Sequence, residues 1–329
     1  MNQSIKEDQI MNSAKSAEVI NKQPRVAILL CTYNGQEFLQ EQLDSFATQT
    51  HSNWVLYVSD DGSTDNTLQI IENFAKSVGE ERVLIFKGPR KGFAANFISL
   101  IHHDEIKADY FSFADQDDVW LPQKTEVALY WLTHQSSTVP ALFCSRTILI
   151  NAKGKTFGQS DHFSRPPSFA NALVQSISGG NTMIFNCAAR NLINIYSPTE
   201  GVISHDWWVY ILVTGNDGLV KYDPIGYIQY RQHAGNLVGM NGTWLARIKR
   251  VIQLFQGRFR RWNDQNEKLI LANIGFLTKD NLSLFLRYAE IRRCQNAVMR
   301  VSLLRQSPIY RQTFLGNLGL IVAAFFKKI

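Results

Sequence analysis

Acidic side chains gather in three short segments of this chain of 329 residues. DQDD (Asp115–Asp118) directly follows the apolar run YFSFA, SDDGSTD (Ser59–Asp65) follows WVLYV, and HDWW (His205–Trp208) lies further along the chain. Carboxylates spaced one residue apart at a strand end repel one another unless a cation or a substrate compensates their charge. Because Mg²⁺ and Mn²⁺ prefer carboxylate, water and phosphate oxygens, DQDD predicts a metal site in preference to a plain acidic loop. SDDGSTD alone is equally typical of a turn followed by a helix cap.

Short apolar runs alternate with helical periods from Val26 to about Lys155. The runs predict buried strands, and apolar residues that recur every three or four positions between them predict helices. This alternation is typical of a doubly wound, parallel α/β sheet, in which ligands bind at the carboxyl ends of the strands. The predicted strands are Val26–Cys31, Trp54–Ser59, Val83–Phe86, Tyr110–Ala114 and Ala141–Ile150.

Charge is distributed unevenly along the chain. Up to Gly239 there are 18 basic and 24 acidic residues, whereas from Met240 onward there are 16 basic and 4 acidic ones. The acidic body gives no reason to expect nucleic acid, while a strongly basic segment usually faces nucleic acid or an anionic membrane. Trp244–Trp262 interleaves aromatic residues with Lys and Arg at helical spacing, which predicts a helix at a membrane surface. The alternative is that this helix packs on the body and exposes its charges to water.

Composition and chain ends indicate where the protein works. An apolar fraction of 45% excludes a fully disordered chain, and four cysteines without a CxxC pair favour a reducing compartment. The first residues lack the apolar core of a secretory signal, and the apolar stretch Phe314–Phe326 is too short to span a membrane. We therefore predict a cytoplasmic protein, peripheral at the inner face of the plasma membrane. Its predicted parts are a disordered leader (1–24), a catalytic body (25–239) and a basic helical segment (240–329).

Several enzyme classes lack their signatures here. The chain has no GxGxxG after its first strand, no GxxxxGK[ST] and no GxSxG. These absences argue against a dinucleotide-binding dehydrogenase, a P-loop NTPase and an α/β-hydrolase.

Six segments, taken in order over about Val26–Gly239, resemble the family 2 glycosyltransferases of GT-A fold. They are VAILLCTYNG, VSDDGSTDNT, KGPRKGFAANF, ADQDDVW, SGGNTMIFN and SHDWW. The combination of ADQDDVW, HDWW and YRQHAGN is most similar to bacterial rhamnosyltransferases. The resemblance implies a Rossmann-like, mostly parallel sheet flanked by helices, followed here by the basic helical segment.

The resemblance also implies roles for individual residues. Asp206 occupies the position of the catalytic base, although His205 stands before it where glutamate is commoner. Asp115 and Asp117 match the metal motif, which implies Mg²⁺ or Mn²⁺, and His233 is a candidate further ligand. The expected donor-binding residues are Thr32, Tyr33, Asn34, Asp60, Asp61, Lys91, Asn96, Asp115, Gln116 and Arg231, the last as a clamp on the diphosphate. The expected acceptor-binding residues are Gly179, Gly180, Asn181 and Trp207.

The implied reaction is inverting transfer of a sugar, L-rhamnose from dTDP-L-rhamnose, to a lipid-linked or polysaccharide acceptor in bacterial cell-surface glycan synthesis. Partial burial against Trp207 and Trp208 would raise the pKa of Asp206 and make it a better base. Trp207 would stack on an acceptor sugar, with core packing as its alternative, whereas we expect Trp208 in the core. The rival functions are transfer of another hexose from a UDP- or GDP-sugar, a sugar nucleotidyltransferase, and a non-catalytic sugar-binding module.

Overall fold

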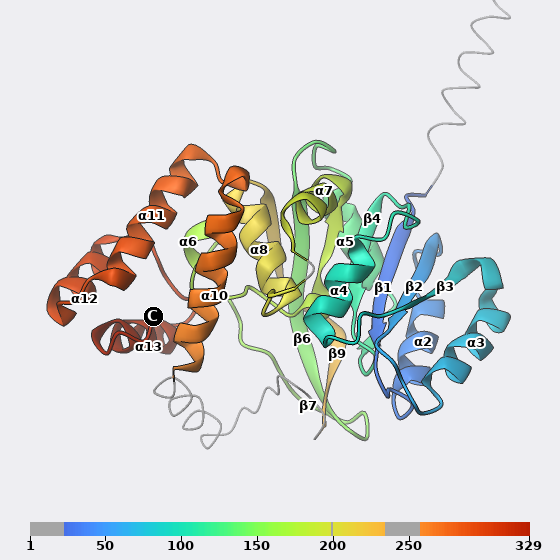
Figure 1. Ribbon diagram of the computed structural model, residues 1–329. Coiled ribbons are helices and arrows are strands. Elements are labelled where there is room, and N and C mark those ends of the chain that lie inside the picture. Colours follow the sequence, from blue (N-terminus) through green and yellow to red (C-terminus); the bar gives the residue numbers. More distant parts are fainter. Residues whose placement is uncertain (1–22, 199, 234–256) are drawn as a thin grey trace, which may run out of the picture.

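The computed structural model describes residues 23–198, 200–233 and 257–329. Within these residues a single sheet of nine strands runs through the molecule (Figure 1). Most of the leader predicted for 1–24, most of the helix predicted for 244–262 and the domain boundary predicted at 239 lie outside the described residues.

The first half of the sheet is parallel. It holds β1 (Val26–Thr32), β2 (Trp54–Asp60), β3 (Val83–Lys87) and β4 (Tyr110–Ala114) in the order β3-β2-β1-β4. β1 and β2 are buried along their whole length, because side chains of both faces pack against helices. The carboxyl ends of β1, β2 and β4 therefore meet at one edge and carry the acidic turns there.

The second half of the sheet mixes strand directions. β8 (Ile184–Asn186) runs antiparallel to β4 and to β6 (Ala141–Asn151). β9 (Leu219–Gln232) runs parallel to β6, and β5 (Val119–Trp120) pairs antiparallel with β9. β7 (Thr156–Gln159) pairs with β6 off this path. The five predicted strands correspond to β1–β4 and β6, but the antiparallel β5, β7 and β8 were not foreseen.

Helices cover both faces of the sheet. α2 (Leu39–Ala47) and α3 (Thr67–Val78) pack against one face of β1 and β2. α4 (Phe93–Ile101), α6 (Phe169–Ala172), α7 (Cys187–Tyr196) and α8 (His205–Gly215) share the other core, while α5 (Lys124–Leu132) packs on β6 and β8. α8 is apolar on nearly every side and is buried accordingly, except at Asp206.

In the described part of the basic C-terminal segment, residues 257–329, four α-helices lie at the end of the molecule opposite α2 and α3 (Figure 1). They are α10 (Arg258–Ala272), α11 (Lys279–Arg293), α12 (Ala297–Gln306) and α13 (Phe314–Phe325). The helical prediction for this segment is confirmed. Trp262 packs edge-on against Trp207, and Phe276 packs edge-on against Trp208, so the segment shares the core of α8. In the described part of the chain no helix combines the length and the apolar character needed to cross a membrane.

Candidate functional site

The turn after β2 is closed by the Asp60 carboxylate. Its Oδ1 accepts hydrogen bonds from the hydroxyls of Thr32 (2.9 Å) and Ser63 (2.6 Å). Its Oδ2 accepts from the amides of Gly62 (3.1 Å) and Ser63 (2.8 Å). Asp60 is buried, and this set of donors fixes the turn against the end of β1. Thr32 and Asp60, both predicted donor-binding residues, thus contact each other.

Two further predicted donor residues bridge the ends of β1 and β4. The Tyr33 amide donates to Gln116 Oε1 (2.9 Å), and Gln116 Nε2 donates back to the Tyr33 carbonyl (3.1 Å). Asn34 adopts a positive φ of 47° and accepts a hydrogen bond from the Thr64 amide (2.9 Å). The side chain of Tyr33 remains exposed, so its ring offers a stacking surface beside the acidic turns.

The segment between β3 and α4 is organised by Asp61, whose carboxylate accepts from the amides of Arg90 (2.5 Å) and Gly92 (3.0 Å). Lys91 lies on the surface and forms an ion pair with Glu200. Asn96 is buried, and it exchanges two hydrogen bonds with Ser59, to the hydroxyl (2.6 Å) and the carbonyl (2.9 Å). Asn96 therefore holds the end of β2 in place, and both polar atoms of its side-chain amide form hydrogen bonds with Ser59.

The turn after β4 concentrates negative charge. Burial, together with the charges of Asp117 and Asp206, raises the pKa of Asp115 to about 8. Asp118 is fully buried, and burial, together with the charges of Asp117 and Asp115, raises its pKa well above the ordinary value. The Asn181 side chain and the Arg231 amide (3.2 Å) donate to Asp118. The side chain of Asn181, a predicted acceptor residue, thus contacts the acidic turn.

Arg231 does not lie where a diphosphate clamp was predicted. Its side chain is buried, with an ion pair to Glu41 (2.6 Å) and hydrogen bonds to the carbonyls of Asp117 (2.9 Å) and Ala152 (3.1 Å). The guanidinium also lies 4.6 Å from the centre of the Phe38 ring. Because its donors are directed at the protein, Arg231 fixes the acidic turn and does not extend toward a ligand. This corrects the prediction.

His233 contacts the acidic turn directly. One ring nitrogen, Nε2, lies 2.8 Å from Asp117 Oδ2, and both side chains are about one-fifth exposed, at 21% and 18%. Carboxylates and an imidazole suit a divalent ion that also keeps water and phosphate oxygens. Within residues 23–198, 200–233 and 257–329, however, no three His, Cys, Asp or Glu side chains are arranged to hold a metal ion. The chemistry of Asp115, Asp117 and His233 therefore fits a metal only with further ligands from the substrate.

Asp206 lies in the first turn of α8, where the helix dipole favours a negative charge. Its carboxylate accepts hydrogen bonds from the amides of Gly180 (3.2 Å) and Trp207 (2.6 Å) and from the hydroxyl of Ser204. A Cβ at position 180 would collide with the imidazole of His205, so this close approach requires glycine. The structure thus brings Gly180 and Asp206 together.

The residue before Asp206 is unusual. His205 is buried, its ring stacks on Phe97 at 4.0 Å, and it meets Phe113 edge-on at 4.7 Å. Neither ring nitrogen has a hydrogen-bond partner in the part of the chain that the structure describes. Burial lowers the pKa of His205 to about 4, so the imidazole is neutral at pH 7.

Trp207 is buried, and its indole N–H donates to the Ala172 carbonyl at 2.6 Å. It therefore packs in the core, and the predicted stacking on an acceptor sugar finds no open ring face. Trp208 is fully buried, as its sequence context suggested.

Sequence reasoning missed a buried lysine beneath the acidic turn. Lys124 donates to the Ser112 hydroxyl (2.9 Å), and its ammonium lies 3.4 Å from the centre of the Trp120 ring. Burial lowers the pKa of Lys124 well below its ordinary value, whereas the charge of Asp118 opposes that shift. At the start of a helix, a lysine carries no sequence signal for burial. Glu41, which is exposed, likewise carries no sequence signal for its ion pair with Arg231.

Comparisons with known proteins show similarity to glycosyltransferases. Residues 27–190 match the model of the family described as Glycosyl transferase family 2. The dTDP-rhamnosyl transferase RfbG of Shigella flexneri is 29% identical over 284 residues, which cover 80% of this chain and 94% of that protein. An uncharacterized glycosyltransferase of Rickettsia typhi is also 29% identical, over 84% of either chain.

Solved structures show the fold. TarS residues 1–349 of S. aureus in complex with UDP superposes with a TM-score of 0.54 at 16% identity, over 82% of this chain and 71% of that one. The complex of the same protein with UDP-GlcNAc gives 0.53 at 13% identity, over 92% and 90%. The predicted α/β fold of GT-A type is confirmed.

Proposed function

Because the chain belongs to glycosyl transferase family 2, we propose that it is an inverting transferase that moves L-rhamnose from dTDP-L-rhamnose to a glycan or lipid-linked acceptor. One observation carries the reaction type: Asp206, held at the start of α8, lies close enough to the acidic turn to raise the pKa of Asp115. In this proposal the Asp206 carboxylate acts from the acceptor side on a donor that binds at the acidic turn. The choice of donor is supported by the similarity to RfbG, which is described as a dTDP-rhamnosyl transferase.

Asp206 is the general base in this proposal. The acceptor hydroxyl oxygen forms a bond to the anomeric carbon, the bond from that carbon to the diphosphate breaks, and the hydroxyl proton passes to the Asp206 carboxylate. The amides of Gly180 and Trp207 orient this carboxylate. Since no covalent nucleophile takes part, the configuration at the anomeric carbon inverts. Gly179 and Gly180 line the acceptor side.

The donor binds along the ends of β1, β2 and β4 in this proposal. The exposed ring of Tyr33 stacks on the nucleotide base, beside the turn that Thr32, Asn34, Asp60 and Gln116 hold in shape. Asp61 and Lys91 belong to the segment that flanks the donor. Asp115, Asp117 and His233 would hold Mg²⁺ or Mn²⁺ together with the diphosphate, where such an ion would supply positive charge for the leaving phosphates.

We place this activity at the inner face of a bacterial plasma membrane, in the synthesis of cell-surface glycans. The location is supported by the charge of the C-terminal segment, with 16 basic and 4 acidic residues from Met240 onward.

The decisive experiment is a donor-hydrolysis panel. The full chain is incubated with dTDP-L-rhamnose and with UDP- and GDP-hexoses, with Mg²⁺, with Mn²⁺ and with a chelator. We expect fastest release of dTDP, lost on chelation. Faster release of UDP or GDP would replace the rhamnose donor by another hexose. Release of pyrophosphate from a sugar 1-phosphate and a nucleoside triphosphate would show a nucleotidyltransferase. Binding without turnover of any donor would leave a sugar-binding module.

A further inference from the structure

The outward face of α13 is apolar. On its inner side the helix buries Leu320, Ala323 and Ala324 against the neighbouring helices. On the other side Phe314 is 83% exposed and Phe326 is 53% exposed. A surface helix normally presents polar residues to water, so an apolar outward face indicates a partner. The exposed members of this stripe are Phe314, Leu315, Leu318, Phe325 and Phe326.

The apolar surface continues from α13 onto α12. Val298 and Met299 of α12 are also largely exposed, at 73% and 56%. Between the two helices lies a cavity of about 360 Å³ whose lining is entirely apolar. Such a groove suits hydrocarbon. Its lining consists of Val298, Val301, Ile321, Val322, Phe325 and Phe326.

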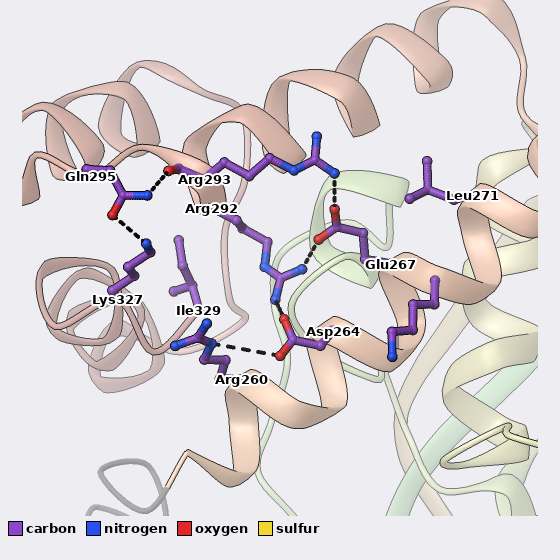
Figure 2. Close-up of a pocket in the computed structure, with 10 residues that line it drawn as sticks. Arg260, Asp264, Glu267, Leu271, Arg292, Arg293, Gln295, Lys327 and Ile329 are labelled. Carbon is purple, nitrogen blue, oxygen red and sulfur yellow. Dashed lines mark hydrogen bonds and ion pairs between the residues drawn. The ribbon is translucent and has the colours of Figure 1, made fainter.

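A second cavity, of about 500 Å³, has the opposite character (Figure 2). It lies among α10, α11 and the residues that follow α13, and Lys327 in its lining directly follows Phe326 in the apolar groove. Five cationic side chains line it against two carboxylates, Asp264 and Glu267. A cavity of this size accommodates a lipid head group.

The carboxylates of this basic cavity are already neutralised by arginines. Arg292, which is buried, pairs with Asp264 (2.5 Å) and with Glu267, and Arg293 pairs with Glu267 at 2.7 Å (Figure 2). Among the described residues the two lysines of the cavity, Lys268 and Lys327, have no such partner. Lys327 donates to the neutral Gln295 side chain (2.6 Å), and Lys268 forms no ion pair within the described residues. The cavity therefore presents two uncompensated ammonium groups next to a hydrocarbon-like groove.

We propose that α12, α13 and the basic cavity form a binding surface for anionic phospholipid, with the head-group phosphate at Lys268 and Lys327 and the acyl chains against the apolar groove. The inference rests on the proposed location at a membrane and names the surface and the lipid chemistry. At 1.5 Å per residue α13 is about 18 Å long, so it lies in the plane of the interface and does not cross the bilayer. The basic cavity attracts a negatively charged phosphate, whereas it repels the same basic surface on a second copy of the chain. The charges therefore favour a lipid as the partner.

The test is flotation of the full chain with vesicles of phosphatidylcholine alone and of phosphatidylcholine mixed with phosphatidylglycerol. We expect strong binding to the mixed vesicles only. Lys268→Gln with Lys327→Gln should weaken that binding about 25-fold, since each basic residue near an anionic surface contributes about fivefold. Phe325→Ser with Phe326→Ser should weaken it about tenfold or more, because two side chains lose their burial in hydrocarbon.

Matched controls lie at distant exposed positions. Lys76→Gln on α3 removes an exposed charge, and Ile195→Ser on α7 removes a side chain that is 70% exposed. Both should bind vesicles like the wild type. Donor hydrolysis should be unchanged in every variant, which reports correct folding and keeps this test separate from the transferase proposal.

Three results would overturn the inference. Undiminished vesicle binding by both double variants would show that another segment contacts the membrane. The proposed membrane location would then stand, but the proposed binding surface would be wrong. Failure of the wild type to bind mixed vesicles would remove the location and the inference together, whatever the hydrolysis panel shows. A dimeric mass that becomes monomeric in the Phe325→Ser, Phe326→Ser variant, without vesicle binding, would assign the stripe to a second copy of the chain.

Discussion

Two acidic turns of similar composition follow β2 and β4, the parallel strands on either side of β1, yet they carry their charge in different ways. In the turn after β2, protein donors fill the acceptor positions of Asp60, and two backbone amides bind Asp61. In the turn after β4, Asp115 faces the charges of Asp117 and Asp206, and its pKa rises to about 8. The first turn is complete without a ligand, whereas the second holds charge that a cation or a proton must neutralise.

This contrast shows that hydrogen-bond donors supplied by the protein, more than residue types, distinguish a structural carboxylate from one that is available to a ligand. Asp206 tests the rule, because it has both properties. It accepts three hydrogen bonds at the start of α8, and its charge still acts on Asp115.

The largest effect is expected for Asp206→Asn. Donor binding should persist, because the carboxylate acts only when the proton moves, while transfer should fall about 10²–10⁴-fold. Turnover and donor affinity are measured separately, with Asp104→Asn on an exposed turn as the matched control. Turnover near that of the wild type would place the base elsewhere and leave Asp206 a purely structural group.

Asp117→Ala should weaken donor binding itself. The side chain contacts His233 and belongs to the proposed metal site, so we expect donor affinity in Mg²⁺ or Mn²⁺ to fall about 10- to 100-fold. Titration of the donor with metal and with a chelator provides the internal control. Equal affinities of wild type and variant under both conditions would contradict the assignment of this turn to the metal.

The parallel strands and the position of the acidic turns were predictable, because a continuous apolar run such as Val26–Cys31 is typical of a buried strand, here β1. The antiparallel strand β8 was not predictable, since its three residues are too few to give a periodic pattern. Apolar periodicity predicts burial and says little about which distant strand pairs with which.

The positions of the carboxylates in the candidate site were predictable from the sequence, whereas the directions of the Arg231 and Trp207 side chains were not. Arg231 looked like a diphosphate ligand, but its partner Glu41 lies 190 residues away along the chain. Trp207 looked like a sugar platform, but its indole N–H bonds to a carbonyl on α6. In both cases the direction of the side chain depends on a remote partner, and residue type does not encode that direction.

Asp60→Asn should lower stability more than it alters catalysis. The amide offers one acceptor oxygen where the carboxylate offers two, so buried donors of the turn lose a partner, at about 1–3 kcal/mol. Urea unfolding of the variant is compared with that of Asp44→Asn, whose side chain accepts one exposed hydrogen bond. Unchanged stability together with weakened donor binding would make Asp60 a ligand group and erase the contrast between the two turns.

The smallest effect concerns the pH dependence of stability, and it tests the other turn. The native pKa of Asp115, about 8, lies above the ordinary value of 3.8, so between these pH values the folded protein holds a proton that the unfolded chain has lost. Stability therefore falls as pH rises through this window, by at most about 1.4 kcal/mol per pH unit for one group. Asp115→Asn should remove that fall, whereas Asp44→Asn should retain it.

Comparing the urea unfolding of wild type and Asp115→Asn between about pH 6.5 and 8 isolates this contribution. Burial lowers the pKa of His205 to about 4, so only the unfolded chain binds a proton there between about pH 6.5 and 4. His205 therefore lowers stability only as pH falls through that range. Above that range Asp118, whose pKa is also raised, and Lys124, whose pKa is lowered, contribute to the slope, so the Asp115 contribution is the difference between wild type and Asp115→Asn. Parallel stability curves of wild type and Asp115→Asn would mean that the Asp115 carboxylate is ionised throughout. The turn after β4 would then be as complete without a ligand as the turn after β2.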